Sequence, residues 1–291
     1  MISIASGKGG TGKTTIAVNL ALYLSKIQQI ALFDLDVEEP NVNHFLHYSM
    51  THFEDVNILR PEVNESLCTF CGLCAELCEF KALAVLPQQV MIFSELCHGC
   101  GLCKIACPAN AISEIPHKLG TIEKAKNSSS IESTNINENL TFYEGTLRVG
   151  EAMAAPIIRE MKKVAFTKNY DHIILDLPPG SACPVIEALS DTDYAVLVTE
   201  PTPAGEHDLK IAIEVVKQLN IPFGIVNNRS DIGDDRISQL ARKEGYKLLL
   251  EVPHDNEILN LYSQGIPLIG SGKNFDLIFE KLWEQIQEIE K

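Results

Sequence analysis

SGKGGTGKTT, residues 6–15, contains the phosphate-binding pattern G-x-x-x-x-G-K-[ST]. The apolar stretch MISIAS runs directly into it, and a segment with Ile16, Leu20, Leu24 and Ile27 at near-helical spacing follows it. A strand before such a loop and a helix after it form the context in which loop amides and a helix N-terminus bind phosphate. This stretch therefore predicts a nucleotide site on an α/β fold.

Within this loop, particular side chains have expected tasks. We expect Lys13 to reach the β- and γ-phosphates of ATP, and the Thr14 hydroxyl to bind Mg²⁺. The glycines are expected to let the backbone approach the phosphates closely. The candidate nucleotide-binding residues of the loop are Gly7, Gly9, Gly10, Thr11, Gly12, Lys13, Thr14 and Thr15. Lys8 is a second lysine that the ordinary pattern does not require.

Outside a cysteine-rich middle region, apolar strands alternate with helices. Strands are expected at residues 30–36, 172–176, 194–201, 222–229 and 247–253, and residues 206–219 form one of the intervening helices. This alternation predicts an α/β parallel-sheet fold covered by helices on both faces. Ligands of such sheets bind at the carboxyl ends of the strands.

Charge and composition limit the classes of binding partner that the chain is expected to have. The chain has 24 Lys and Arg against 39 Asp and Glu, a net charge of −15, which disfavours nucleic acid and anionic membrane as partners. No stretch approaches the roughly 18 apolar residues of a membrane span, and no secretory leader precedes the first motif, so we expect a cytoplasmic protein. In a reducing compartment, nine cysteines favour metal binding over a disulfide framework.

Eight of the cysteines form an internal repeat. CTFCGLCAELCEFKAL, starting at Cys68, aligns with CHGCGLCKIACPANAI, starting at Cys97, at a constant offset of 29 residues. Both halves spell C-x2-C-x2-C-x3-C and resemble the bacterial ferredoxins, in which the fourth cysteine ligates the other cluster. The resemblance implies two [4Fe–4S] clusters. Quartet one is Cys68, Cys71, Cys74 and Cys107, and quartet two is Cys97, Cys100, Cys103 and Cys78.

Structural zinc is the alternative for these cysteines. Zinc sites usually pair C-x2-C units rather than triplets with a trailing fourth cysteine, so the spacing favours iron–sulfur clusters. One departure from the ferredoxin run is Glu79, which stands where a proline is expected, whereas Pro108 follows the second half. This departure removes no ligand.

KGGTGKTT, LFDLDVEEPN and DLPPG together resemble the MinD/ParA/nitrogenase-iron-protein ATPases. In that family the early lysine, here Lys8, crosses a dimer interface to the partner's nucleotide, so the resemblance implies a homodimer, ATP-dependent or constitutive. It also implies that Asp36 orients the attacking water, with Asp34 as a supporting acid, and that Asp176 lies near Mg²⁺. The candidate catalytic residues are Lys8, Lys13, Asp36 and Asp176.

The same resemblance implies which residues contact the nucleotide base. VNNR fits the adenine-reading segment, with Asn228 as the hydrogen-bonding residue and Asn227 as a one-residue alternative. VPHDNEI, which includes Pro253, fits the loop that closes over the base.

The resemblance spans nearly the whole chain and is closest for members that carry an inserted ferredoxin domain. It implies a P-loop ATPase domain at 1–62 and 148–291, and an inserted two-cluster α+β ferredoxin-like domain at 63–116. Residues 117–147 are expected to connect the two, as short strands LGTIEKA and LTFYEGTLRVG joined by an exposed polar loop at 127–139.

Other residues are assigned to packing rather than chemistry. Cys183 is expected to be an ordinary buried thiol, with a redox or bridging-metal role as the weaker alternative. His98, His172 and His254 show no ligand spacing and are expected to pack or lie on the surface. A final helix with an acidic outer face is expected to pack on the sheet rather than on lipid. Its apolar stripe is Phe275, Ile278, Phe279, Leu282, Ile286 and Ile289.

Three functional hypotheses follow. The leading one is ATP-dependent electron transfer, in which an ATP-switched dimer acts on two [4Fe–4S] clusters that exchange electrons with a redox donor and acceptor. The second is an ATP-dependent assembly or carrier protein that releases iron–sulfur clusters or metal cofactors to a client. The third is a positioning ATPase whose clusters sense redox state. Tightly held ferredoxin-type clusters favour the first.

Overall fold

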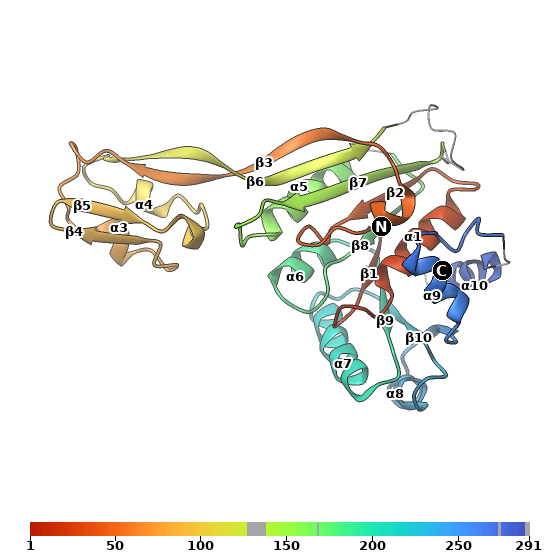
Figure 1. Cartoon of the computed structure of the whole chain (residues 1–291). Coiled ribbons are helices and arrows are strands. Elements are labelled where there is room, and N and C mark those ends of the chain that lie inside the picture. The colour runs from red at the N-terminus through yellow and green to blue at the C-terminus, as the bar shows by residue number, and fades with distance from the viewer. Residues whose placement is uncertain (127–137, 168, 273–274, 289–291) are drawn as a thin grey trace.

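The computed structural model describes residues 1–126, 138–167, 169–272 and 275–288. In these residues a nine-stranded sheet runs in the order β11-β10-β9-β1-β8-β2-β7-β6-β3 (Figure 1). Its strands are β1 (Ile2–Ala5), β2 (Ile30–Asp34), β3 (Met50–Val63), β6 (Ile112–Ala125), β7 (Leu140–Leu147), β8 (His172–Asp176), β9 (Tyr194–Thr199), β10 (Phe223–Asn228) and β11 (Leu248–Val252). A separate pair is β4 (Leu83–Leu86) with β5 (Gln89–Ile92).

Helices connect most of these strands. They are α1 (Lys13–Leu24), α2 (Asn43–Leu46), α3 (Leu73–Glu76), α4 (Leu102–Ile105), α5 (Ala155–Phe166), α6 (Cys183–Leu189), α7 (Pro203–Gln218), α8 (Arg236–Glu244), α9 (Asn256–Ser263) and α10 (Asp276–Gln287), with a 3-10 turn at Ser94–Leu96. Within the described residues, every helix is too short or too polar to span a bilayer.

The seven strands from β11 to β7 are parallel, which confirms the predicted α/β parallel sheet. Each strand contributes to two apolar layers, because successive side chains point to opposite faces. In β2, Ile30 and Leu32 join the core under α1 and α10, whereas Ala31 and Phe33 join the core under α5, α6, α7 and α8. The sheet is therefore buried on both sides.

One helix prediction needs correction, and part of another lies outside the described residues. α1 ends at Leu24, so Ile27 lies beyond it and is 81 % exposed, although the periodicity placed it on the buried face. In the final helix, Phe279 and Leu282 are buried in the core that α10 shares with α1. Ile289 and most of the predicted polar loop, residues 127–137, lie outside the described residues.

One edge of the sheet is antiparallel, which the sequence did not predict. β6 pairs with β7 only from Gly120 to Lys124, whereas β3 pairs with β6 along its whole length. Residues 57–63 and 112–119 therefore leave the sheet as a two-stranded ribbon (Figure 1). The prediction of one short strand at LGTIEKA missed this, because β6 begins at Ile112 and its partner β3 was not predicted at all.

The ribbon carries the cysteine unit, residues 64–111, at its far end (Figure 1). The unit repeats its backbone as well as its sequence. α3 and α4, and the residues with positive φ before and after them, recur 29 residues apart. The repeated positive-φ pairs are Phe70 with Gly99, Gly72 with Gly101, and Lys81 with Asn110. Leu83 pairs with Ile92 as Ile112 pairs with Val63, so the two halves are related by a pseudo-twofold axis.

Candidate nucleotide and cluster sites

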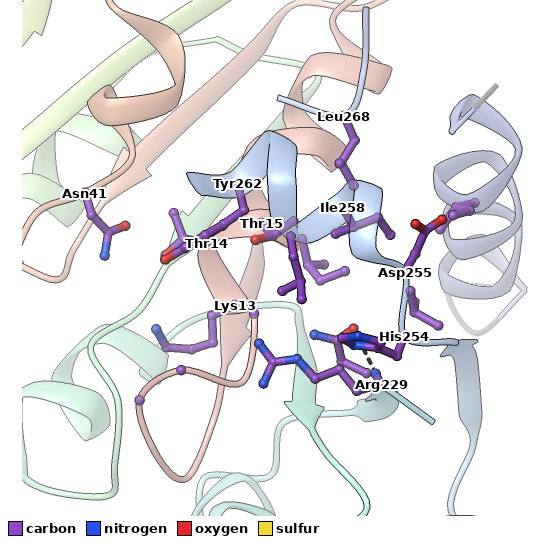
Figure 2. Close-up of a pocket in the computed structure, with 18 of the residues that line it drawn as sticks. Lys13, Thr14, Thr15, Asn41, Arg229, His254, Asp255, Ile258, Tyr262 and Leu268 are labelled. Carbon is purple, nitrogen blue, oxygen red and sulfur yellow. Dashed lines mark hydrogen bonds between the residues drawn. The ribbon is translucent and has the colours of Figure 1, made fainter. Parts of the chain in front are cut away.

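A cavity of about 320 Å³ opens at the carboxyl ends of the parallel strands (Figure 2). The P-loop forms one wall and the segment from β11 into α9 forms another. Nine of the sequence-predicted site residues line it, and these are Gly9, Gly10, Gly12, Lys13, Thr14, Thr15, Asp36, Asn228 and Pro253. The volume lies within the range of small-molecule sites.

The P-loop requires glycine where its backbone turns. Gly12 has φ +99 and immediately precedes α1 as its N-cap, and a Cβ built there would lie 2.5 Å from Asn228 Nδ2. Any side chain would therefore be strained and would clash. Asn228 Nδ2 donates to the Thr11 carbonyl at 2.9 Å, whereas Asn227 is buried behind it, near Glu251. Of the two asparagines, only Asn228 lines the cavity.

The groups expected around Mg²⁺ meet at the start of α1. Thr14 Oγ1 donates to Asp176 Oδ2 at 2.6 Å, and Lys13 is buried beside them. Burial raises the pKa of Asp176, against the charge of Lys13 and the Thr14 hydrogen bond. Within the described residues, Asp176 Oδ1 is buried with no hydrogen-bond partner. A buried hydroxyl and a carboxylate with one unpaired oxygen fit a site for Mg²⁺, which takes oxygen ligands.

The loop after β2 is held by a buried carboxylate. Asp34 is fully buried and accepts from the backbone amides of Asp36, Asn41 and Val42. Burial raises the pKa of Asp34, and the charge of Asp176 on the adjacent strand raises it further, against the amide hydrogen bonds. Asp34 thus shapes the loop that brings Asp36 to the cavity.

Asp36 is the carboxyl that this loop presents to the P-loop. Burial raises the pKa of Asp36 to about 6, with Lys13 opposing the shift and Asp176 adding to it. A carboxyl with a pKa near neutrality, beside the phosphate cradle, suits a group that orients water or takes up a proton.

Four predicted site residues do not line the cavity. Gly7 and Thr11 belong to the loop but do not line the cavity: Thr11 is buried, and a Cβ on Gly7 would meet the Asp208 backbone at 2.3 Å. Asp176 lies beneath Thr14. Lys8 is directed elsewhere, because its Nζ contacts Glu200 Oε1 at 2.5 Å.

Sequence reasoning missed several cavity residues. The cavity is also lined by Asn41, Arg229, Leu259 and Tyr262. Figure 2 labels Asn41, Arg229 and Tyr262. Tyr262 follows Ile258 by four residues on α9, so helical periodicity could have found it. Arg229 stands beside the predicted Asn228, but no sequence signal indicated its role.

Two further cavities in the cysteine unit each contain one complete predicted quartet. The first is lined by Cys68, Cys71, Cys74 and Cys107, and the second by Cys97, Cys100, Cys103 and Cys78. In both halves the second cysteine of the triplet, Cys71 or Cys100, is exposed. Burial raises the pKa of Cys74, and nearby Cys68 and Cys107 raise it further. Burial likewise raises the pKa of Cys103 to about 11, with two thiols of its own quartet adding to it.

The fourth cysteine of each half accepts the same hydrogen bond. Ala82 N donates to Cys78 Sγ at 3.3 Å, and Ala111 N donates to Cys107 Sγ at 3.3 Å. Amide donors to cysteine sulfur favour the thiolate and help to set the properties of bound clusters.

Four thiols around each cavity, with amide donors to sulfur, fit a cluster that takes one cysteine on each of four irons. Within the described residues, no three His, Cys, Asp or Glu side chains are grouped to hold a single metal ion.

The remaining cysteine and the histidines lie in different surroundings. Cys183 begins α6 and is exposed, so the expectation of a buried thiol is wrong. His98 stacks on Phe80 with ring centroids 3.7 Å apart, beside quartet two. His172 contacts Trp283, and His254 lines the nucleotide cavity.

Comparison with known proteins gives a family and a fold. Residues 2–268 match the family described as the CobQ/CobB/MinD/ParA nucleotide binding domain. An uncharacterized protein of Methanocaldococcus jannaschii is 33 % identical over 91 % of this chain and 90 % of its own length. The iron-sulfur cluster carrier protein of Pyrococcus furiosus is 24 % identical over 99 % of this chain and 87 % of its own length.

A solved structure shares the architecture. The septum site-determining protein MinD of Pyrococcus horikoshii, complexed with Mg-ADP, superposes with a TM-score of 0.59 at 20 % identity, covering 99 % of this chain and 96 % of that chain. At this identity the likeness supports the fold alone.

Proposed function

The chain belongs to the CobQ/CobB/MinD/ParA family of nucleotide-binding domains, and on that premise we propose that it hydrolyses ATP and uses hydrolysis to deliver iron–sulfur clusters to a client protein. The observation that carries the proposal is the pair of cysteine cavities, each lined by one complete quartet, in the same chain as a P-loop cavity. The name of the Pyrococcus furiosus relative supports a carrier in preference to the electron-transfer protein favoured by the sequence alone.

The nucleotide half of the proposal uses residues that already lie together. Lys13 and the P-loop amides would hold the phosphates, and Thr14 with Asp176 would hold Mg²⁺. Asp36 would orient the attacking water. Positive charge at the phosphates stabilises phosphoryl transfer. Lys8 would supply further positive charge to the nucleotide of a second copy, so that hydrolysis waits for a homodimer.

In the cluster half, quartets one and two would each hold a [4Fe–4S] cluster, and Cys71 and Cys100 would mark where it meets solvent. An exposed ligand favours release, because a client thiolate can reach the cluster there. This geometry supports a carrier despite the ferredoxin-like spacing.

A physical route joins the two halves. The segment after Asp176 leads into α6, and α6 packs against α5. The loop before α5 carries Glu151, whose carboxylate contacts Arg60 at 2.8 Å and His117 at 2.7 Å on the ribbon. A change at the nucleotide would reach the ribbon through these contacts. Transmission of this kind needs two discrete arrangements of the packed elements.

Electron transfer remains the second candidate. It is favoured by the pseudo-twofold pairing of two full quartets, because paired clusters suit an electron path. A protein of this kind would keep its clusters during turnover.

Cluster transfer to an apo-enzyme that requires a [4Fe–4S] cluster separates the candidates. The reconstituted protein would be mixed anaerobically with that apo-enzyme, with MgATP, with MgADP and without nucleotide, and iron would be followed in both proteins. We expect MgATP to change the rate of cluster transfer from the wild-type protein at least severalfold. In Lys13→Ala, the transfer rate should no longer depend on nucleotide. Clusters that stay bound while the protein passes electrons to an acceptor would reject the carrier and favour electron transfer.

A further inference from the structure

The lysine that marks this P-loop makes an ion pair within its own subunit. Lys8 Nζ contacts Glu200 Oε1 at 2.5 Å, and the two residues are 192 positions apart in the chain. The Lys8 side chain is 31 % exposed and that of Glu200 is 15 % exposed. The pair is therefore partly shielded from solvent. Lys8 does not line the nucleotide cavity while this contact is made.

Glu200 is itself anchored on the wall of the cavity. Its other oxygen, Oε2, accepts from Arg229 NH1 at 3.2 Å, and Arg229 lines the nucleotide cavity. Figure 2 shows Arg229 and Lys13 among the side chains that line the cavity. Glu200 directly follows β9, and Arg229 directly follows β10, so two adjacent parallel strands hold the carboxylate in place. One oxygen is thus fixed to the cavity wall and the other is left for Lys8.

We propose that Glu200 is a positioning residue that holds Lys8 on its own subunit, so that Lys8 becomes available to a second copy only when the Lys8–Glu200 pair opens. This inference rests on the proposed function, because it assumes that Lys8 acts on the nucleotide of a second copy. The physical reason is competition for one ammonium. While it contacts Glu200, Lys8 lies outside the nucleotide cavity, so reaching a phosphate of the partner requires the side chain to leave Glu200, and each dimer opens two such pairs.

The expected size follows from the exposure of the pair. Partly exposed ion pairs contribute up to about fivefold to an equilibrium, and two pairs open per dimer, so removing both favours the dimer by up to about 25-fold. A restraint of this size raises the protein concentration at which dimers form by the same factor.

The test measures dimerisation directly. Sedimentation of the anaerobic, cluster-loaded protein over a range of protein concentrations, with a non-hydrolysable ATP analogue, gives the dimer dissociation constant. Glu200→Gln should lower this constant by up to about 25-fold and leave nucleotide affinity unchanged. Glu206→Gln is the matched control, because Glu206 also contacts two cations, Lys210 and Arg236, but lies away from the cavity. It should behave like the wild type.

A double-mutant comparison shows whether Glu200 acts through Lys8. In a Lys8→Ala background, Glu200→Gln should leave the dimer constant unchanged. An equal effect of Glu200→Gln with and without Lys8, or a loss of nucleotide affinity, would mean that Glu200 acts through Arg229 and would overturn the inference. The inference would also be overturned if the wild type binds nucleotide and has a dimer dissociation constant equal to or lower than that of Glu200→Gln. A wild type that binds no nucleotide would instead remove the proposed function itself, and the inference with it.

Discussion

The nucleotide cavity and the cysteine unit differ most in what holds their chemical groups in place. Around the nucleotide cavity, Lys13, Thr14 and Asp176 are buried and lie on strands and helices that two large apolar layers support. The cysteine unit has a core cluster of only four buried residues, Ala82, Leu83, Val90 and Cys97. A unit this small usually needs a metal, a disulfide or a partner to be stable.

This difference teaches that the two regions depend on their ligands in different ways. The sheet can form the nucleotide cavity before any nucleotide binds. The cysteine unit, in contrast, is expected to gain much of its folding free energy from cluster binding, because the ligands must be brought together for the metal to bind. Nucleotide would thus change the conformation of a domain that is already folded, whereas cluster binding would stabilise the folded state of the cysteine unit.

The largest expected effect is the response to loss of clusters. Chelation of iron under anaerobic conditions should remove amide protection throughout residues 64–111 and leave the parallel strands protected. Hydrogen exchange read by mass spectrometry measures both regions in one sample. Unchanged protection in the cysteine unit would show that its small core is sufficient for folding without clusters, and would contradict the difference drawn between the two regions.

Single cysteine substitutions sharpen the same prediction. Cys107→Ser should deplete iron and expose the half of the unit around quartet one, because it removes the ligand that crosses between the halves. Cys183→Ser is the matched control, since it makes the same substitution at a cysteine that lies outside both quartets. It should retain the full iron content, and iron loss there would restore a metal role for Cys183.

The next effect concerns hydrolysis at the folded site. Lys8→Ala should lower the rate of ATP hydrolysis about 10³-fold, the size expected for a cation supplied to the phosphates in the transition state. Nucleotide affinity should stay near that of the wild type, because Lys8 does not line the cavity. Steady-state hydrolysis and equilibrium nucleotide titration measure the two quantities separately. Full hydrolysis in this variant would rule out the proposed in-trans role.

A smaller effect is expected where the two regions join. Arg60 and Glu151 form an ion pair whose side chains are only 7 % and 11 % exposed. Removing one partner of a buried pair costs about 3 kcal/mol, because the other charge is left unpaired. Glu151→Ala should therefore speed amide exchange in residues 57–63 and leave amide exchange in α1 unchanged. Glu160→Ala, which removes an exposed pair with Lys163, is the control and should have no effect on the ribbon.

The smallest effect is a pH dependence at the nucleotide cavity. Because burial raises the pKa of Asp36 from 3.8 to about 6, the folded protein binds more protons than the unfolded chain between these values. Asp36 therefore makes the nucleotide-free protein less stable as pH rises through this window. Denaturant unfolding at pH 4.5, 5.5 and 6.5 should show a shallower decline in Asp36→Asn than in the wild type. Equal slopes would show that Asp36 titrates normally.

The P-loop and the family could be predicted because their signals are local: residue type and spacing within ten positions set the strand, the loop and the helix. The Lys8–Glu200 pair could not be, because a contact across 192 positions has no local signal. β3 was missed because its apolar residues show no regular alternation, and only pairing with β6 makes them a strand. Cys183 was misplaced because the preference of cysteine for burial does not apply at the exposed start of α6.

The most direct test of the central claim combines both regions in one anaerobic sample. Iron and sulfide would be quantified in the reconstituted protein, and EPR spectra of the reduced protein recorded without nucleotide, with ADP and with a non-hydrolysable ATP analogue. The account predicts about eight irons per chain, four for each quartet, and cluster spectra or cluster release that change with nucleotide. Four irons or fewer, or clusters whose spectra and release ignore nucleotide, would contradict it.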